Sequence, residues 1–419
     1  MKLMVVGGGG REHALIQMLK KNNTVEMIYA LPGNGGIARD AICVPIRATD
    51  VDGIARFAGE NAIDFAVVAP DDPLALGAVD RLHALGIPCF GPDARAAEIE
   101  ASKAFSKRLM RKYGIPTARF EVFDDANSAL EYLKTADAPV VVKADGLALG
   151  KGVLICETRG EAEDAVKHIM LGRAFGKSGN RVVIEECLEG PEVSVLAFTD
   201  GKTVVPMASS MDHKRANDND LGLNTGGMGA VAPNPYYTEA IADRCMREIF
   251  LPTVRAMNEE GRRFKGCLYF GLMLTANGPK VIEYNCRFGD PEAQAVLPLL
   301  ETDLLDIMRA VEDERLCEIG VRFRPGACCC VVIASGGYPE KYETGMKIEL
   351  GAMPEDAYVF HSGTAIAADG NFVTAGGRVL GVSATADTLR EAVGRAYDAA
   401  RRVHFDGMHM RSDIGAKAL

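Results

Sequence analysis

Residues 280–292, with the sequence KVIEYNCRFGDPE, carry three polar side chains whose types and spacing suit phosphate chemistry. The segment opens with a short, largely apolar run that predicts a strand. Glu283, Asn285 and Arg287 occupy alternate positions at its end, so they project from one face while the extended run lasts. A carboxylate and an amide oxygen suit a hard cation such as Mg²⁺, and an arginine can neutralise a transferring phosphoryl group. The segment is therefore either a metal and phosphate site or the polar edge of a surface strand.

The composition is that of an ordinary globular protein and argues against several functional classes. The 419 residues are 48% hydrophobic and 25% charged, which predicts roughly two to four domains. A formal net charge of −10 argues against a nucleic-acid surface, and no apolar run approaches the ~18 residues of a membrane span. Eleven cysteines lie scattered without a CxxC pair, which favours reduced thiols over disulfides or zinc. We expect a soluble, cytoplasmic protein that binds neither nucleic acid nor membranes.

Strand and helix signals alternate through the first hundred residues, which predicts a parallel α/β, Rossmann-like domain over residues 1–101. Its predicted strands and helices are residues 2–6, 26–30, 64–69 and 87–90, and residues 11–21, 51–61 and 74–85, respectively. Functional loops should lie at the carboxyl ends of the strands. The candidates are the loops at residues 7–13, 31–38 and 70–74, the last of which contains Asp71.

The glycine run GGGGREH at residues 7–13 does not fit a dinucleotide fingerprint. Glu12 or His13 stands where the third glycine belongs, and the second strand ends without the acid that binds ribose. The run suits a single phosphate held by backbone N–H groups, the helix dipole and an arginine, or it is only a tight turn. The candidate phosphate contacts are Gly8, Gly9, Gly10 and Arg11.

Residues 102–326 follow as a second predicted domain, which opens with a basic amphipathic helix at 102–113. We expect its basic residues to form a solvated face, with Lys103 at the helix start as a phosphate contact. Those residues are Lys103, Lys107, Arg108, Arg111 and Lys112.

A glycine-rich hairpin tip lies within a small α+β unit, a lid over residues 117–190. Strands at residues 139–143 and 153–156 flank the tip ADGLALGKG, which can close over a triphosphate while Lys143 reaches from its strand. The tip contains Gly146, Lys151 and Gly152. It is not a P-loop, because only three residues separate the glycines of GLALGK.

Several acids follow the lid hairpin. Glu185 and Glu186 end a predicted strand, and one of them must face solvent or a ligand, since a buried unpaired carboxylate is costly. Adenine or ribose recognition fits these residues and Glu192, and so does an acidic strand edge.

The sequence of residues 209–235 predicts a long functional loop. Asp212 and Lys214 are its candidate substrate contacts, while His213 is a less favoured candidate. Thr225, Gly226 and Gly227 lie in TGGMG, which can bring backbone N–H groups against a ligand.

Residues 327–419 form a third, α+β pattern without a group of candidate catalytic residues. We expect this small domain to pack against the entrance to the substrate site.

Together these motifs resemble the ATP-grasp ligases, and among them the phosphoribosylamine–glycine ligase family of purine synthesis. The resemblance covers almost the whole chain and rests on GGREHA, PGNGG, SKAF, KADGLALGKGV, DHKR, NTGGMGA, EYNCRFGDPE, GGYP and GGRVL.

The resemblance implies a central ATP-grasp fold and roles for particular residues. ATP lies under the Lys151 loop, Mg²⁺ or Mn²⁺ bridges the phosphates, and the reaction occurs at Arg287 and Asp290. The implied nucleotide contacts are Lys103, Lys143, Gly146, Lys151, Gly152, Glu185, Glu186, Leu188 and Glu192, and the implied metal ligands are Glu283 and Asn285. The Gly8–Arg11 turn takes the 5′-phosphate of phosphoribosylamine.

The family pattern is not matched everywhere. Asp71 stands where glutamate is usual, Leu223 stands where proline is usual, and the strand at 267–275 lacks the acid that many ATP-grasp relatives place there. The resemblance implies ATP-dependent joining of glycine to 5-phosphoribosylamine through glycyl phosphate, by a monomer or a weak homodimer. The alternatives are another ATP-grasp ligase using formate, bicarbonate or another amino acid, a nucleotide-binding oxidoreductase, and a regulatory ATP-binding module.

Overall fold

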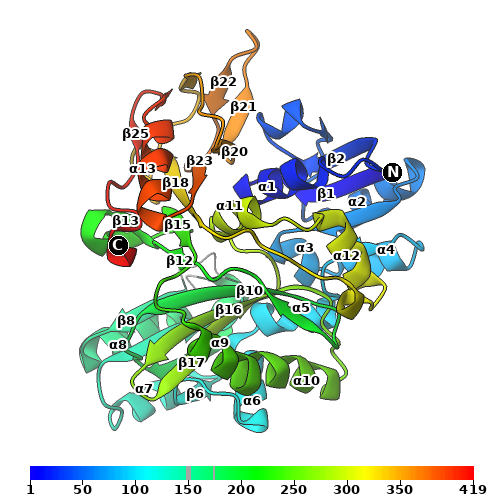
Figure 1. The fold of residues 1–419 in the computed structure, drawn as a ribbon. Helices are drawn as coiled ribbons and strands as arrows, with labels where there is room; N and C mark the ends of the chain where they lie inside the picture. The colour runs from blue at the N-terminus through cyan, green and yellow to red at the C-terminus, as the bar shows by residue number, and fades with distance from the viewer. Residues whose placement is uncertain (148–151, 173–174) are drawn as a thin grey trace.

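The computed structural model describes residues 1–147, 152–172 and 175–419 (Figure 1). The N-terminal region (blue) and the C-terminal region (orange and red) lie next to each other above the central region (cyan to green). No helix of the described residues is long and apolar enough to cross a membrane.

The N-terminal region is a five-stranded parallel sheet in the order β3-β2-β1-β4-β5. Its strands are β1 (Lys2–Gly7), β2 (Met27–Pro32), β3 (Ile42–Cys43), β4 (Phe65–Val68) and β5 (Cys89–Phe90). Its helices are α1 (Gly10–Leu19), α2 (Val51–Glu60), α3 (Asp71–Ala75), α4 (Ala78–His83) and α5 (Ala94–Ala101). The helix predicted over residues 74–85 is wrong as one element, because Gly77, with φ of +83°, separates α3 from α4.

The first part of the central region carries a four-stranded antiparallel sheet, the lid sheet, in the order β6-β9-β7-β8. Its strands are β6 (Phe120–Phe123), β7 (Val140–Ala144), β8 (Val153–Cys156) and β9 (Val182–Glu186). The helices here are α6 (Lys103–Tyr113), α7 (Ala126–Leu133) and α8 (Arg159–Val166). Apolar residues of β7 and β9 pack against α7 and α8, which fixes the side of the sheet that faces away from the site.

A second four-stranded antiparallel sheet has the order β11-β10-β16-β17. Its strands are β10 (Glu192–Thr199), β11 (Val204–Pro206), β16 (Gly266–Thr275) and β17 (Gly278–Asn285). Helices α9 (Glu239–Cys245) and α10 (Leu251–Glu259) pack near it, and α11 (Glu292–Val296), η6 (Leu297–Leu299) and α12 (Leu304–Glu312) follow β17. The strand predicted at the start of residues 280–292 is confirmed.

The C-terminal region contains a six-stranded sheet that also recruits two strands from the middle of the chain. The sheet consists of β12 (Met211–Asp212), β15 (Gly229–Ala232), β18 (Ala327–Ser335), β20 (Ala357–His361), β23 (Arg378–Ala386) and β25 (Met408–His409). Helix α13 (Leu389–Ala400) packs on it. Small two-stranded ladders join β13 (Arg215–Asn217) to β14 (Leu221–Asn224), β19 (Glu349–Leu350) to β24 (Val403–His404), and β21 (Thr364–Ile366) to β22 (Phe372–Thr374).

The interpretation of residues 209–235 as a loop is wrong. This stretch contains β12 to β15, and the apolar run of β15 pairs with the cysteine-rich strand β18. These strands are too short to show a periodic pattern in the sequence, and β15 is stabilised by a partner about a hundred residues away. The mixed α/β and α+β class is confirmed, whereas the boundaries at 101/102 and 326/327 and the lid limits stay predictions.

Candidate active site

Strand β17 presents Glu283 and Asn285 on one face, as the spacing predicts. Both side chains are half-buried, while Tyr284 between them is buried. Gly271 of β16 is paired with Glu283, and a Cβ there would lie only 2.9 Å from Glu283 Cγ. The glycine therefore leaves room for the glutamate, whose neighbours Lys214, Lys143 and Lys103 hold its pKa below the ordinary value although burial opposes this shift.

Arg287 lies beyond the end of β17, so its position depends on a partner rather than on strand alternation. Its Nη2 donates to Glu100 Oε1 at 2.9 Å, and Glu100 Oε2 accepts from the backbone N–H of Cys286 at 2.7 Å. Glu100 is buried at the end of α5, and burial raises its pKa although Arg287 opposes the shift. Arg287 Nε is buried and has no hydrogen-bond partner in the described part of the chain, so one donor remains for a substrate oxygen.

A buried group of charges joins α6 to the lid sheet. Lys107 Nζ lies 2.8 Å from Glu185 Oε2, and Lys143 Nζ lies 3.1 Å from Glu185 Oε1. Lys143 Nζ also donates to the carbonyl of Ile282 in β17 at 3.1 Å. The prediction that Lys107 belongs to a solvated face is wrong, because only 2% of its side chain is exposed. Burial lowers its pKa to about 8, and Glu185 opposes that shift.

Lys103 links the start of α6 to the glycine-rich tip. Its Nζ donates to the carbonyl of Gly146 at 2.7 Å, and Asp145 accepts from the backbone N–H of Ala104 at 3.0 Å. Gly146 has φ of +115°, and a Cβ there would lie 2.6 Å from Ser178 Oγ. Gly152 is buried at the far side of the tip. Lys151, predicted to contact ATP, lies outside the described residues.

The remaining predicted nucleotide contacts lie at and after the end of β9. Glu186 Oε2 is 2.7 Å from Arg119 Nε, and its Oε1 is 3.0 Å from Lys280 Nζ. Leu188 is half-buried, and Glu192 is exposed at the start of β10. Glu192 pairs with Lys214 at 3.0 Å, so its carboxylate already has a partner inside the protein.

Asp212, at the end of β12, is half-buried, and one of its carboxylate oxygens is buried. Its Oδ1 has no hydrogen-bond partner in the described chain. Burial and the nearby Glu292 carboxylate raise its pKa well above the ordinary value, while Lys214 opposes the shift. Lys214 also lies 3.9 Å from Glu283, so it connects this acid pair to the face of β17. Sequence reasoning missed Glu292, which is buried at the start of α11.

The TGGMG loop packs against the segment that carries Asp290. A Cβ at Gly227 would lie 2.4 Å from Pro291 Cδ, so only glycine permits this approach. The N–H groups predicted to face a ligand already have partners, since Gly226 N donates to the Tyr338 hydroxyl and Gly227 N to Thr225 Oγ1.

Arg378, at the start of β23, holds the TGGMG loop and Asp290 together. Its Nη1 donates to the carbonyls of Gly226 at 2.7 Å and Asp290 at 2.8 Å, and lies 3.3 Å from Asp290 Oδ1. Arg378 is half-buried and therefore brings a guanidinium from the C-terminal region beside a predicted catalytic acid. The GGRVL motif was the only signal for it.

The glycine run forms the turn between β1 and α1, as predicted. Neighbouring protein groups, however, already occupy several of its hydrogen-bond donors. The backbone N–H of Gly9 donates to Glu12 Oε2 at 2.6 Å. Arg11 is buried, with its guanidinium bonded to Glu12 Oε1 at 2.6 Å and to the carbonyl of Phe288 at 3.1 Å. A phosphate at this turn would therefore share these donors with Glu12 and Phe288. Asp71 begins α3, and burial opposes but does not outweigh the charges of Glu100 and Asp71, which raise the pKa of Arg287.

The C-terminal region closes over the glycine run through hydrogen bonds that sequence reasoning missed. His361 N donates to His13 Nδ1 at 2.8 Å, which leaves the proton on His13 Nε2 to bond Asp40 Oδ2 at 2.8 Å. Asn34 Nδ2 donates both to the carbonyl of Gly8 at 2.9 Å and to that of His361 at 2.7 Å. A Cβ at Gly10 would lie 2.6 Å from Ser362 Oγ. The turn is therefore enclosed by two regions of the chain.

The residues on β17 fit a divalent cation that binds phosphate. Rotating the Asn285 amide lets its nitrogen donate to Glu100 Oε1 at 2.9 Å and to the carbonyl of Tyr284 at 3.2 Å, and leaves the amide oxygen on the opposite side as the acceptor. A carboxylate and an amide oxygen are hard ligands that leave several positions for water and phosphate. Among the described residues no group of three or more His, Cys, Asp or Glu side chains could hold a metal by itself.

Three family models match the chain in succession. They are the N domain (residues 1–100), the ATP-grasp (A) domain (residues 101–293) and the C domain (residues 328–417) of phosphoribosylglycinamide synthetase. The phosphoribosylamine–glycine ligase of Xanthomonas axonopodis pv. citri is 47% identical over 423 residues, which cover 100% of this chain and 98% of the relative.

Solved structures agree in fold. The crystal structure of phosphoribosylamine–glycine ligase from Thermotoga maritima has a TM-score of 0.87 and 34% identity, covering 99% of this chain and 100% of that one. The biotin carboxylase domain of Hydrogenobacter thermophilus 2-oxoglutarate carboxylase, in complex with MgADP and bicarbonate, has a TM-score of 0.76 at 18% identity. It covers 98% of this chain and 91% of that chain, and it supports the fold alone.

The matches extend over the regions that contain the glycine turn, the lid sheet and β17. They confirm the ATP-grasp fold, the three-part architecture and an ATP-dependent ligase. The chain belongs to the phosphoribosylglycinamide synthetase family, the phosphoribosylamine–glycine ligases of purine biosynthesis.

Proposed function

We propose that this chain joins glycine to 5-phosphoribosylamine at the end of β17, using ATP and Mg²⁺ or Mn²⁺, and releases glycinamide ribonucleotide, ADP and phosphate. The observation that carries the assignment of roles is the surroundings of Glu283, whose carboxylate lies 3.9 Å from Lys214 and is also stabilised by the charges of Lys143 and Lys103. Such a centre can hold a triphosphate and its metal at once. The metal supplies charge neutralisation between the phosphates, with Glu283 and Asn285 as its protein ligands.

The first step transfers the γ-phosphoryl group to glycine. A glycine carboxylate oxygen attacks phosphorus, the bond to the β–γ bridging oxygen breaks, and ADP leaves with the electron pair. Lys103 and Lys143 lie where they can hold the phosphates, and Arg287 offers its unpartnered Nε to a developing charge. Asp212 Oδ1, buried and without a partner, suits the ammonium group of glycine.

The second step forms the amide. The amine of phosphoribosylamine attacks the carbonyl carbon of glycyl phosphate, phosphate leaves, and the amine loses one proton. Asp290 is held by Arg378 and Gln294 close to the Gly8–Arg11 turn, which we assign to the 5′-phosphate. We assign Glu185, Glu186, Leu188 and Glu192, at and after the end of β9, to the nucleoside.

ADP release tests the assignment when each substrate is omitted in turn. Full release should require both glycine and freshly generated phosphoribosylamine, and the product should contain glycine and the ribose phosphate. Formate and bicarbonate serve as controls. Release that follows either of them instead would keep the ATP-grasp fold and overturn the substrates.

The metal assignment is tested with Glu283→Gln. Loss of the carboxylate charge should raise the Mg²⁺ or Mn²⁺ concentration for half-maximal activity by roughly ten- to a hundredfold. Titration of both metals with each enzyme measures this change. Glu301→Gln, an exposed glutamate outside the site, is the matched control, and an unchanged metal requirement in Glu283→Gln would move the metal elsewhere.

We also propose that the protein works in the cytoplasm as a monomer or a weak homodimer, without nucleic acid or membrane partners. All eleven cysteines are free thiols in the structure, which supports a reducing compartment. Size-exclusion chromatography with light scattering measures the mass, and a stable higher oligomer would contradict this proposal.

A further inference from the structure

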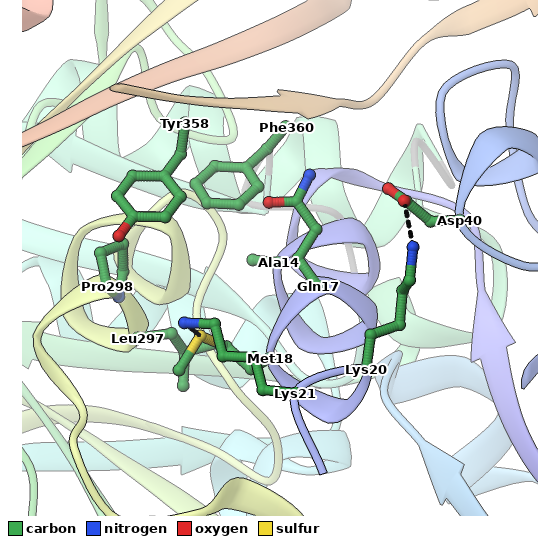
Figure 2. Close-up of a pocket in the computed structure, with 10 residues that line it drawn as sticks. All are labelled: Ala14, Gln17, Met18, Lys20, Lys21, Asp40, Leu297, Pro298, Tyr358 and Phe360. Carbon is green, nitrogen blue, oxygen red and sulfur yellow. Dashed lines mark hydrogen bonds and ion pairs between the residues drawn. The ribbon is translucent and has the colours of Figure 1, made fainter. Parts of the chain in front are cut away.

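A cavity separate from the predicted active-site residues lies where α1, η6 and β20 meet. Its volume is about 250 Å³. Figure 2 shows Met18, Leu297 and Pro298 on one side and the rings of Tyr358 and Phe360 on another. None of the residues assigned to ATP, metal or substrate lines it. The proposed function therefore does not account for this cavity.

The wall formed by β20 is aromatic and flat. The Tyr358 and Phe360 rings are stacked, with centroids 6.0 Å apart and planes at 8° to each other. They lie at alternate positions of β20, so both project from the same face of the strand. Tyr358 is half-buried, and its hydroxyl makes no hydrogen bond to another described residue. This wall suits an aromatic ring that bears a polar substituent.

The rim of the cavity carries positive charge. Lys20 is neutralised by Asp40, at 2.6 Å, whereas Lys21 has no ion pair with an acid in the described part of the chain. Lys21 Nζ instead lies 3.2 Å from Met18 Sδ, and burial and the nearby Arg324 lower its pKa. An anion at this rim would gain a charge partner that the protein does not supply.

We propose that this cavity is a binding site for a small aromatic anion, a carboxylate or sulfonate on one or two fused rings. The ring lies along Tyr358 and Phe360, and the anionic group meets Lys21. The apolar floor of Met18, Leu297 and Pro298 removes the ring from water, which supplies most of the affinity.

The position of the cavity gives such a ligand a route to the active site. The ligand would touch α1 and β20, the same two elements that His13 and His361 join beside the glycine turn. Gln17, which lines the cavity, also donates to the carbonyl of Val359 in β20, at 3.4 Å. Binding therefore should stabilise the contact between these regions. This consequence rests on the proposed function, whereas the binding site itself does not.

The absence of tryptophan from the chain makes a direct test possible. Tyr358→Trp places a single reporter in the cavity wall, and 8-anilinonaphthalene-1-sulfonate is the probe. With full-length protein saturated with Mg²⁺ and ATP, the probe should quench the tryptophan saturably. Adding Lys21→Glu should weaken the dissociation constant at least tenfold.

Lys134→Glu in the same reporter protein is the matched control. It makes the same change in net charge at an exposed lysine directly after α7, outside the cavity, and should leave the dissociation constant within twofold. Equal weakening by both substitutions, or quenching that does not saturate, would overturn the site.

A competition experiment separates the charge from the ring. 1-Naphthalenesulfonate should displace the probe, whereas 1-naphthylmethylamine, which is cationic at neutral pH, should not. Equal displacement by both compounds would overturn the assignment of an anion.

Discussion

The two sides of the site that we assign to the nucleotide and to the ribonucleotide are held by different forces. On the nucleotide side, Lys107, Lys143 and Glu185 form a buried group of charges between α6 and the lid sheet. On the other side, the Gly8–Arg11 turn is held mainly by backbone and amide hydrogen bonds across the junction with β20. Buried charge is costly to break, whereas a junction of hydrogen bonds can yield locally. We therefore expect the buried charges on the first side to resist local opening, whereas the junction on the second side should open more easily.

Arg287 lies between the two sides, and we expect its replacement to have the largest effect. Arg287→Lys keeps the charge but loses the planar fork, so the bond to Glu100 and the free Nε cannot both be reproduced. We expect kcat to fall by roughly 10²–10³, with little change in the KM for ATP. Steady-state kinetics measure both. Arg395→Lys, at an exposed pair in the C-terminal region, is the control, and equal losses in kcat and ATP affinity would contradict the assigned role.

The buried charges of the nucleotide side should show the next largest effect. Lys107→Met leaves Glu185 with one of its two lysines, which should cost about 3 kcal/mol of local stability. Hydrogen exchange of the β7 and β9 amides measures that loss, and the KM for ATP should rise with it. Lys134→Met, at an exposed lysine, should change neither quantity. Unchanged exchange in Lys107→Met would mean that the buried pair does not hold the lid sheet.

The junction on the ribonucleotide side should show a smaller, more selective effect. His13→Leu removes the acceptor for His361 N and the donor to Asp40. We expect the KM for phosphoribosylamine to rise by about tenfold, the equivalent of 1.4 kcal/mol, while the KM for ATP is unchanged. His13→Asn, which retains an acceptor near the Nδ1 position, should recover part of the loss. An equal rise in the KM values for phosphoribosylamine and ATP would contradict the predicted difference between the two sides.

Acid should gradually lower the free energy of unfolding of the C-terminal region, which contacts the ribonucleotide side. Burial lowers the pKa of His361 to about 3 and that of His213 to about 4. Both imidazoles stay neutral in the folded protein while the unfolded chain takes up protons below about pH 6.5. Stability should therefore be fully present above pH 6.5 and fall as pH drops towards 4, by roughly 1 kcal/mol per pH unit for each histidine.

Thermal unfolding between pH 7 and pH 4.5 measures this dependence. His361→Phe should flatten the slope, because it removes one of the groups that take up protons on unfolding. His404→Phe, an exposed histidine of the same region, is the control. A slope that is the same in wild type and His361→Phe would exclude His361 as a source of acid sensitivity.

Sequence patterns predicted the elements that have their own periodicity. The hairpin strands, the basic helix and the parallel sheet were all predicted from local signals. Glu283 and Asn285 share a face because alternation along a strand is a local property.

Other features depended on partners that lie far away in the sequence. Lys107 looked solvated because its helix is basic, yet Glu185, almost eighty residues later, buries it. Strands β12 and β15 are too short to be recognised without β18. Arg378 and His361 act on the site only because the C-terminal region folds over it. Charge pairing and domain contact of this kind leave no periodic pattern in one sequence.

The most direct test of the central claim is the transfer of oxygen from glycine to phosphate. With glycine labelled by ¹⁸O at both carboxylate oxygens, attack on the γ-phosphate and later expulsion of phosphate place one labelled oxygen in each phosphate released. Mass spectrometry of the phosphate formed in one turnover with phosphoribosylamine measures the label. We expect one ¹⁸O per phosphate and one in the glycinamide ribonucleotide, and phosphate without label would contradict the account.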